Sequence, residues 1–284
     1  MYKLGLIGQN ISASRAPALH KMLGALNHLP ASYELQVPSD KSAEAFSQKL
    51  DEMRKEGFTG TNVTFPYKQI AIERADVVNE AVRKTGASNT LCIKEGKIYA
   101  FNTDYTGFIR GYRGRVEDLP AGKVLLIGAG GVGRAIGFAL FEVGATELMV
   151  TDLNVAGAQS LVDAVNAAGY KARYVPAEEV GEAAKQADGL VNCTPVGHYS
   201  TPGIPLAVEH FAGQSWAFDA VYTPMDTEFL IAANQAGLKI VSGFDLFFYQ
   251  GIDAFELFTG QPVQNIEPVW QQFREQYDVV SDLI

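Results

Sequence analysis

The sequence predicts an α/β protein of two domains, in which an N-terminal α/β domain precedes a domain built on a doubly wound parallel sheet. Strand-like and helix-like segments alternate along nearly all of the 284 residues, a pattern typical of strands covered by helices on both faces. A glycine-rich turn follows an apolar strand near the middle of the chain, and a segment of domain size precedes that turn. Near the end, residues 244–260 form a helical, aromatic-rich segment.

We expect residues 1–104 to form the first domain and residues 105–243 to form the second. Residues 244–284 are expected to return to the first domain as a C-terminal helix. The glycine-rich turn lies in the second domain and has Gly128, Gly130 and Gly133 at the spacing of a dinucleotide-binding motif. We therefore interpret the second domain as the domain that binds a dinucleotide, and the first as the substrate and catalytic domain.

The first half shows short apolar runs separated by segments with helical apolar spacing. The expected strands are Tyr2–Ile7, Ser32–Val37 and Gly60–Thr64, and the expected helices are Ala18–Leu26, Ala43–Lys55, 68–72 and 80–84. Residues Thr90–Tyr99 predict a hairpin that turns at Glu95-Gly96. In the second half, strands are expected from about Val124 and at Leu148–Thr151, Gly189–Asn192, Ala217–Val221 and Lys239–Val241, with helical runs between them.

The glycine-rich turn has the spacing of a Rossmann dinucleotide-binding motif. An apolar strand runs into Gly128, Gly130 and Gly133 (G-x-G-x-x-G), and a helix follows. The first glycine allows a tight turn, the second lets a pyrophosphate approach the backbone, and the third lets the helix pack close to the strand. The turn and the start of the helix also include Ala129, Gly131 and Val132, whose backbone we expect to contribute to cofactor binding.

An acidic residue ends the second strand of this unit. Asp152 follows Leu148–Thr151, where a carboxylate accepts hydrogen bonds from the adenosine ribose and repels a 2′-phosphate. The sequence therefore predicts NAD as the cofactor, in preference to NADP.

Composition excludes several classes of function. The net charge is −9 with 19% charged residues, so the chain offers no basic footprint for nucleic acid or anionic membranes. There is no long apolar span and no signal-peptide layout. Cys92 and Cys193 are far apart, the four histidines are dispersed, and no metal site is implied. We expect a cytoplasmic protein with reduced cysteines, acting on a small molecule as a monomer or homodimer.

Four polar segments before the glycine turn follow strand-like runs. They are Ser12–Arg15, Asn62–Lys68, Gly86–Thr90 and Phe101–Asp104. Ligands of open α/β sheets bind outside the carboxyl ends of strands, so these loops are expected to line one pocket. Their hydroxyls, amides, cation and anion suit a polyhydroxylated carboxylic acid.

These segments, in this order, resemble the shikimate dehydrogenase family over nearly the whole chain. Asn62–Lys68 matches N-V-T-x-P-x-K, Gly86–Thr90 matches G-A-x-N-T, Asn102–Gly107 matches N-T-D-x-x-G, Asn192–Gly197 matches N-x-T-P-x-G, and Asp219–Pro224 matches D-x-x-Y-x-P. A sixth family motif, G-x-x-x-x-x-x-Q, appears as Gly243 to Gln250.

The resemblance implies reversible oxidation of a ring hydroxyl of shikimate or quinate, at position 3, with hydride transfer to a nicotinamide. It implies that Lys68 and Asp104 carry the proton transfer. The matching substrate-binding positions are Ser14, Thr64, Asn89, Tyr222 and Gln250, and the further cofactor-binding positions are Thr194, Pro195, Val221 and Gly243.

Each of these residues also has an ordinary structural explanation. A lysine is usually a solvated surface group, Asp104 suits the start of a helix, and Thr64 and Asn89 are common turn residues. Tyrosine and glutamine residues near a domain interface, such as Tyr222 and Gln250, often serve only in packing. We interpret the aromatic run that starts at Phe244 as core and not as a cofactor stack.

Three departures from the family pattern affect specificity. Ser14 is followed by Arg15-Ala16-Pro17, whereas the family has S-x-S before the proline and binds the substrate carboxylate with both hydroxyls. NADP-using members have N-R-T where this chain has Asp152-Leu153-Asn154, and Gly157 stands at the later basic position. Leu246 and Phe247 replace a common Met-Leu pair. In this family, NAD preference favours a catabolic side pathway over the biosynthesis of aromatic amino acids.

Other functions remain open from the sequence. An aminoshikimate-type dehydrogenase is motivated by Ala16 and the changed residues 246–247. A non-catalytic ligand sensor on the same scaffold is disfavoured by the intact Lys68 and Asp104. A methylenetetrahydrofolate dehydrogenase-like protein shares the two-domain plan but lacks support from the Asn89 and Asp104 segments.

Overall fold

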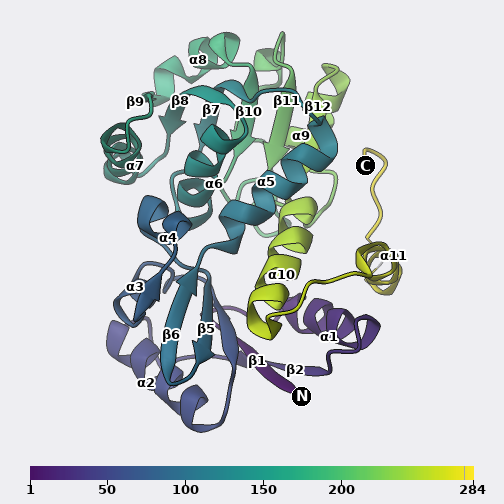
Figure 1. Cartoon of the computed structure of the whole chain (residues 1–284). Coiled ribbons are helices and arrows are strands. Elements are labelled where there is room, and N and C mark those ends of the chain that lie inside the picture. Colours follow the sequence, from purple (N-terminus) through teal and green to yellow (C-terminus); the bar gives the residue numbers. More distant parts are fainter. Residues whose placement is uncertain (278) are drawn as a thin grey trace. The chain divides into compact units, whose positions relative to one another are not determined.

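The chain is described from a computed structural model, which covers residues 1–277 and 279–284. It divides into two compact units: Met1–Thr103 with Phe248–Val279, and Asp104–Phe247 with Val280–Ile284. Each unit holds a six-stranded sheet with helices packed on it, which confirms the predicted α/β class (Figure 1).

The division differs slightly from the expected boundaries. It falls after Thr103 and within the last long helix, after Phe247, whereas we expected residues 104 and 243. The final five residues belong to the second unit and not to the first. Two hydrogen bonds explain this placement, because the Ser281 hydroxyl and the Asp282 N–H both donate to the carboxylate of Asp226.

In the first unit the chain forms the following elements. They are β1 (Tyr2–Ile7), α1 (Ala16–Leu26), β2 (Ala31–Gln36), α2 (Ala43–Lys55), β3 (Gly60–Val63), α3 (Ile70–Glu73), β4 (Val77–Val78), α4 (Glu80–Thr85), β5 (Thr90–Lys94), β6 (Lys97–Phe101), the second part of α10 (Gly243–Thr259) and α11 (Ile266–Gln276).

The first sheet is mixed and not entirely parallel. Its order is β2-β1-β3-β5-β6-β4, and β5 runs antiparallel to both of its neighbours. The predicted hairpin accounts for this, because β5 and β6 are joined by a two-residue turn. Glu95 and Gly96 both have positive φ angles, 52° and 76°, as a type I′ hairpin turn requires.

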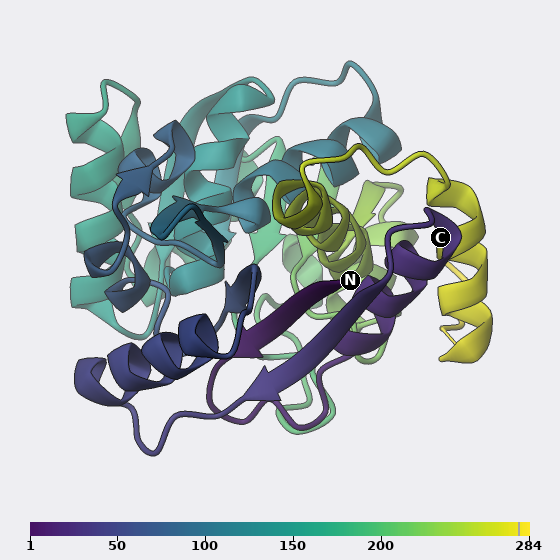
Figure 2. The same cartoon turned by 60° about the horizontal axis from the view of Figure 1, so that its bottom comes forward.

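Helices cover both faces of the first sheet. On one face, α2 places Phe46, Leu50 and Met53 at helical spacing into a core shared with Ile7 and Leu91 of the sheet. On the other face, α10 packs so closely on β3 that a Cβ at Gly60 would collide with the ring of Phe258. Helix α11 packs on α1 (Figures 1 and 2).

The second unit contains the remaining elements. They are α5 (Thr103–Val116), β7 (Gly122–Ile127), α6 (Gly131–Glu142), β8 (Ala145–Thr151), α7 (Val155–Ala167), β9 (Ala172–Tyr174), η1 (Ala177–Glu179), α8 (Val180–Gln186), β10 (Gly189–Asn192), η2 (Val208–His210), β11 (Trp216–Asp219), α9 (Glu228–Gln235), β12 (Lys239–Ser242) and the first part of α10.

The second sheet is parallel throughout, in the order β12-β11-β10-β7-β8-β9. Alternate residues of β7 face opposite layers. Leu125 and Ile127 pack in a cluster with α8 and α9, whereas Leu126 lies near Gly137 of α6, within reach of Leu161 of α7. Figure 1 shows α6 and α8 on opposite sides of the strands. This is the predicted doubly wound arrangement.

The predicted aromatic core is also confirmed. Phe244, Phe248 and Phe255 of α10 are fully buried. Both cysteines are free, Cys92 buried and Cys193 half-buried.

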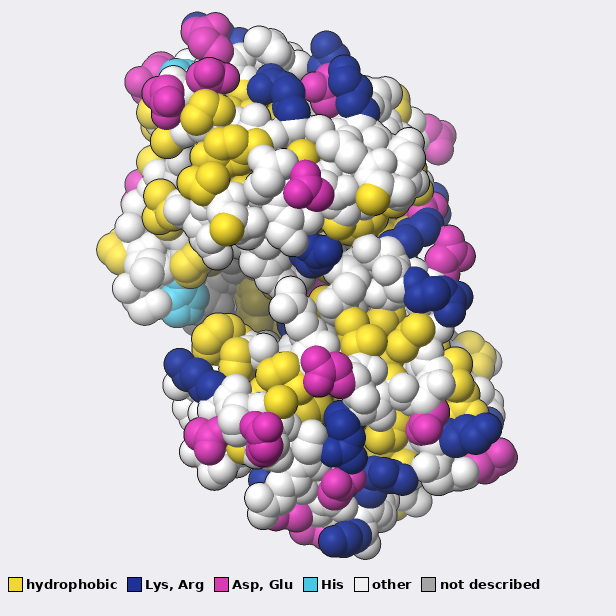
Figure 3. Space-filling model, turned by 90° about the vertical axis from the view of Figure 1, so that its left-hand side faces the viewer, with side chains coloured by type: hydrophobic (Ala, Val, Ile, Leu, Met, Phe, Trp, Pro, Cys, Tyr) yellow, Lys and Arg dark blue, Asp and Glu magenta, His cyan; other side chains and the backbone are white. Residues whose placement is uncertain are grey.

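No helix in the described part of the chain is long and apolar enough to cross a membrane. On the face drawn in Figure 3, basic and acidic side chains are interspersed with apolar ones, and neither sign forms a continuous patch.

Candidate active site

In the first unit, the predicted polar loops follow or precede strands at one edge of the sheet. Ile7 pairs with Val63 at the ends of β1 and β3. The start of β5 lies at this same edge, because Thr90 pairs both with Asn62 and with Phe101, the last residue of β6. The loops that carry Ser14, Thr64 and Asn89 therefore emerge together.

Asn89 is held in a buried hydrogen-bond network that fixes the orientation of its amide. Its Oδ1 accepts from the Thr103 N–H at 2.7 Å, from the Thr103 hydroxyl at 3.1 Å and from the Thr90 hydroxyl at 2.9 Å. A backbone N–H requires an acceptor, so the oxygen must face Thr103. The amide NH₂ is thereby left to act as a hydrogen-bond donor toward a ligand.

The same network reaches Gln250 and continues below Asn89. Thr103 Oγ1 lies 3.4 Å from Gln250 Oε1 of α10. Asn62 Nδ2 donates to the Asn89 carbonyl at 3.3 Å, and the Tyr33 hydroxyl donates to Asn62 Oδ1 at 2.8 Å. Thr103, Asn62 and Tyr33 thus support Asn89 through contacts that sequence reasoning missed, because they join positions 14 or more residues apart.

Lys68 is half-buried in the turn after β3. Its carbonyl accepts the Ser88 N–H at 2.7 Å, which holds the Lys68 and Asn89 loops side by side. Thr64 starts this turn and accepts the Tyr67 N–H at 2.9 Å through its carbonyl. The structure therefore brings Thr64, Lys68, Asn89 and Gln250 together in the first unit.

Ser14 precedes α1, and its hydroxyl oxygen accepts the N–H of Ala16 at 3.3 Å. Ala16 is buried. Its side chain is a methyl group, so this position supplies no hydroxyl where the family pattern has one. The Arg15 guanidinium lies 5.3 Å from the centre of the Tyr277 ring. Arg15 is therefore engaged by an aromatic ring in this structure.

In the second unit, the cofactor-type residues also follow strands at one edge. Ile127 pairs with Thr151 and with Asn192, and Asn192 pairs with Asp219. Asp219 in turn pairs with Ser242. The residues that follow these strands, Gly128, Asp152, Cys193, Ala220 and Gly243, consequently occupy the carboxyl edge of the sheet.

The glycine turn has the geometry that its sequence predicts. Gly128 has φ of 99°, a conformation that favours glycine. A Cβ on Gly133 would collide with the Gly128 carbonyl, so the third glycine lets α6 pack against the turn. At Gly130, the residue before α6, an added Cβ would meet nothing within 4 Å. The space above Gly130 and the N-terminus of α6 fit a diphosphate.

Asp152 has a structural role in addition to the predicted one. One carboxylate oxygen accepts the Ala129 N–H at 2.6 Å, and the other accepts the Asn154 N–H at 2.7 Å. The carboxylate thus ties the glycine turn to the end of β8. Each oxygen keeps a further lone pair with which to accept a ribose hydroxyl.

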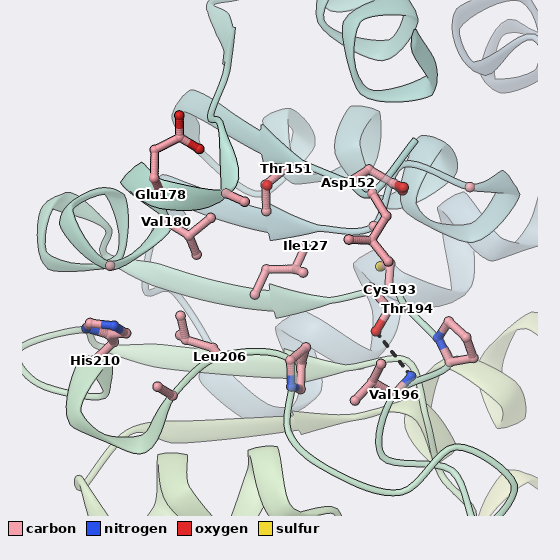
Figure 4. Close-up of a pocket in the computed structure, with 18 of the residues that line it drawn as sticks. Ile127, Thr151, Asp152, Glu178, Val180, Cys193, Thr194, Val196, Leu206 and His210 are labelled. Carbon is pink, nitrogen blue, oxygen red and sulfur yellow. Dashed lines mark hydrogen bonds between the residues drawn. The ribbon is translucent and has the colours of Figure 1, made fainter. Parts of the chain in front are cut away.

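The glycine turn and Asp152 border a pocket with a volume of about 790 Å³, within the usual range of ligand sites. It is lined by Gly128, Gly130, Asp152, Leu153, Thr194 and Pro195, together with residues of α8 and η2 (Figure 4). Its acidic side chains are Asp152, Glu178 and Glu182, and none of the described lining residues is Lys or Arg. The Leu153 side chain is fully exposed (101%).

Thr194 lies in the turn after β10, and the Thr194 side chain stabilises this turn. Its hydroxyl donates to Asn192 Oδ1 at 2.7 Å and accepts the Val196 N–H at 3.2 Å (Figure 4). The buried carboxylate of Asp219 accepts from Asn192, from the Val221 N–H and from the Thr227 hydroxyl. Burial nevertheless raises the pKa of Asp219 to about 7.

The remaining predicted residues also lie near this edge. Gly243 packs on the Ala220 carbonyl, where a Cβ would collide. Tyr222 stacks on Phe247, with ring centres 5.1 Å apart, in accordance with the packing explanation.

Asp104 lies in the first turn of α5 and is buried. Burial raises the pKa of the Cys193 thiol, and the charges of Asp219 and Asp104 raise it further. Lys68 and Asp104 belong to different units, and their catalytic pairing stays a prediction. Across residues 1–277 and 279–284, no cluster of three or more His, Cys, Asp or Glu side chains is arranged to hold a metal ion.

Comparison with known proteins identifies the family to which this chain belongs. A family model described as the shikimate dehydrogenase substrate binding domain matches residues 6–91, and one described as shikimate / quinate 5-dehydrogenase matches residues 113–201. A quinate/shikimate dehydrogenase (NAD(+)) of Corynebacterium efficiens is 39% identical over an alignment of 262 residues, which covers 90% of this chain and 92% of the relative. The chain belongs to the shikimate dehydrogenase family.

Relatives within the shikimate dehydrogenase family differ in their cofactor. The structure of quinate dehydrogenase from Corynebacterium glutamicum in complex with NAD matches with a TM-score of 0.89 and 35% identity, covering 96% of this chain and 99% of that one. A shikimate dehydrogenase (NADP(+)) of Pseudarthrobacter chlorophenolicus is 32% identical over 268 residues, covering 91% of this chain and 90% of the relative. Membership of the shikimate dehydrogenase family therefore establishes that the protein is an oxidoreductase. It does not decide between NAD and NADP, and that decision depends on the residues of the pocket.

Proposed function

We propose that this protein is an NAD-dependent dehydrogenase that reversibly oxidises a ring hydroxyl of quinate or shikimate. The observation that carries the proposal is the Asp152 carboxylate beside the glycine turn, in a pocket whose described lining lacks Lys and Arg. A 2′-phosphate in this pocket would meet negative charge without a cation to neutralise it.

The residues of the pocket fit a dinucleotide. The open space over Gly130 and the first turn of α6 suit the diphosphate, and Asp152 suits the adenosine ribose. Thr194, Pro195, Val221 and Gly243 are proposed to contribute from the neighbouring loops. When bound, the nicotinamide accepts the hydride that leaves the hydroxyl-bearing carbon.

We assign proton transfer to Lys68, with Asp104 as its partner. As the carbon–hydrogen bond breaks, the hydroxyl proton must pass to a base within hydrogen-bond reach. In the direction of reduction, a protonated Lys68 donates the proton to the oxygen that becomes the hydroxyl. The Asn89 amide NH₂, together with Ser14, Thr64, Tyr222 and Gln250, is proposed to bind the substrate's hydroxyl and carboxylate oxygens.

The substrate proposal combines residue chemistry with relatives that are named quinate/shikimate and shikimate dehydrogenases. The proposed site is the hydroxyl at ring position 3, whereas the matching family model is described as a 5-dehydrogenase. NMR of the oxidised product identifies the ring carbon that becomes a ketone.

The test measures NADH formation from quinate, shikimate and their amino-substituted analogues, with NAD and with NADP. We expect turnover of quinate or shikimate with NAD, and at least tenfold lower kcat/KM with NADP. Protein that binds NAD but reduces none of it with any of these acids would be a ligand sensor, and the proposal would be wrong. Higher kcat/KM with the amino analogues would instead favour the second candidate, an aminoshikimate-type dehydrogenase, for which the buried Ala16 is the supporting observation.

A further inference from the structure

One end of the cofactor pocket contains an arrangement that the glycine motif does not explain. His210 ends η2, and its imidazole ring lies against Gly181 in the first turn of α8. A Cβ on Gly181 would approach His210 Cε1 to 2.5 Å and Nε2 to 2.7 Å. Gly181 is not among the residues with positive φ, so its backbone conformation would accept alanine. In this structure the imidazole ring occupies the space that a side chain at position 181 would enter.

The order of residues along the pocket indicates what this end receives. Asp152 and Thr194 lie at one end, Glu178, Val180 and His210 lie at the other, and Ile127 lies between them (Figure 4). A dinucleotide whose diphosphate occupies the glycine turn and whose adenosine ribose meets Asp152 continues away from the turn. Because the adenine is attached to that ribose, it is the group that we expect at the end lined by His210.

We propose that His210 forms a planar contact surface for the adenine ring, and that Gly181 positions it by leaving room for the imidazole. The inference rests on the proposed use of NAD. An aromatic ring beside a purine gains energy from stacking and from the burial of flat apolar surface. Val180 and Leu206 provide apolar surface around the same end of the pocket (Figure 4), in keeping with a site for a base and not for a phosphate.

A charged role for His210 is the alternative to stacking. The neighbouring Glu182 carboxylate pairs with Lys185 at 2.6 Å. That contact is the main cause that lowers the pKa of Glu182, and His210 makes only a minor contribution. Since Lys185 already neutralises Glu182, we assign His210 a role through ring shape. His210→Phe retains a flat ring without a titratable group, whereas His210→Ala removes both.

The experiment measures binding of ADP-ribose and of nicotinamide mononucleotide to the full chain by isothermal titration calorimetry. ADP-ribose contains the adenine half of NAD, and the mononucleotide contains the other half. For His210→Ala we expect the Kd of ADP-ribose to rise about three- to tenfold, with the Kd of the mononucleotide unchanged. His210→Phe is expected to bind ADP-ribose within twofold of the original chain.

Gly181→Ala tests the positioning step without removing the ring. Its Cβ must displace the imidazole, so we expect a loss of ADP-ribose affinity similar to that of His210→Ala. Glu209→Gln is the matched control, because Glu209 precedes His210 in η2 and does not line the pocket. Circular dichroism verifies that each variant is folded.

Unchanged ADP-ribose affinity in folded His210→Ala would overturn the proposal, as would equal losses in His210→Ala and Glu209→Gln. If the original chain binds ADP-ribose but oxidises neither quinate nor shikimate, the proposed function fails and the adenine site stands. If the original chain does not bind ADP-ribose at all, the assignment of the pocket itself is wrong.

Discussion

Asn89 illustrates how much the action of one site residue depends on residues distant in sequence. The G-A-x-N-T resemblance identifies the position, but only the bond from the Thr103 N–H to Oδ1 shows which end of the amide is free to meet a ligand. Asn89→Asp keeps an oxygen for Thr103 and replaces the NH₂ donor with a second, negatively charged acceptor. We expect kcat/KM for the acid substrate to fall ten- to a hundredfold, since a hydrogen bond to a charged group contributes roughly 1.5–3 kcal/mol.

Steady-state kinetics and calorimetry together check this prediction. The Kd of ADP-ribose should be unchanged, because the pocket proposed for adenosine belongs to the second unit. An Asn89→Asp variant with the original kcat/KM would show that the amide does not donate to the substrate.

Ala16 allows the opposite kind of test, in which a missing contact is restored. The residue is buried in the first turn of α1 and donates its N–H to the Ser14 hydroxyl. Ala16→Ser supplies a second hydroxyl for the substrate carboxylate, and we expect KM for quinate or shikimate to fall about tenfold, with kcat little changed. Ala18→Ser, in the same helix, serves as the control. An unchanged KM in Ala16→Ser would place the carboxylate elsewhere.

At the scale of the element, the glycine turn separates structure from binding. Gly133 touches the Gly128 carbonyl, whereas the space beside Gly130 is open. Gly133→Ala is therefore expected to lower both the stability of the second unit and the affinity for ADP-ribose. Gly130→Ala should leave stability within about 0.5 kcal/mol and weaken ADP-ribose binding at least tenfold, because its Cβ would occupy the space that we propose for the diphosphate. Urea unfolding and calorimetry on both variants test this difference, and equal losses of stability would contradict it.

The elements that the sequence predicted are those with a strong local signal. The glycine turn, the hairpin at Glu95-Gly96 and α2 each carry their pattern within a few neighbouring residues. Strands β4 and β9 escaped prediction because two or three residues cannot display an alternation. Helix α11 does carry a signal, since Ile266, Val269 and Phe273 repeat at helical spacing, and it was overlooked.

For the site, sequence reasoning identified the positions but not their environment. The partners of Asn89 and the contact between Gly181 and His210 join residues that no local pattern relates, because the sheet register and the packing of helices bring them together. The double hydrogen bond of Asp152 is of the same kind. Such contacts are properties of the folded chain.

At the scale of the whole molecule, the proposed proton donor Lys68 and the cofactor pocket belong to different units. Lys68 belongs to the first unit and the pocket beside Asp152 to the second. Lys68→Met is expected to lower kcat at least a hundredfold, because it removes the group that exchanges the substrate proton, and to leave the Kd of ADP-ribose within twofold. Stopped-flow and titration measurements check both values. Loss of ADP-ribose binding together with kcat would indicate misfolding, and retention of kcat would exclude Lys68 from proton transfer.

Two buried titratable groups give the units opposite responses to pH. In the first unit, burial lowers the pKa of His20 to about 3, so the folded chain binds this proton less tightly than the unfolded chain and loses stability as pH falls below about 6.5. In the second unit, burial raises the pKa of Asp219 to about 7. The folded chain then binds the proton more tightly, and stability increases as pH falls through 7. From pH 7 to pH 5, each effect amounts to about 2 kcal/mol.

The two tryptophans report on the units separately, since Trp270 lies in the first and Trp216 in the second. Urea unfolding is followed by fluorescence in Trp216→Phe and Trp270→Phe backgrounds at pH 7 and pH 5. Acidification should move the Trp270 transition to lower urea relative to His20→Phe, which lacks the titrating ring. It should move the Trp216 transition to higher urea relative to Asp219→Asn, which stays neutral. All other titrating groups are the same in the two proteins of each comparison, so they cancel. If Asp219→Asn does not change the shift of the urea transition between pH 7 and pH 5, Asp219 is ionised in the folded chain well below pH 7. The hydrogen bonds that it accepts from Asn192, Val221 and Thr227 would then outweigh its burial.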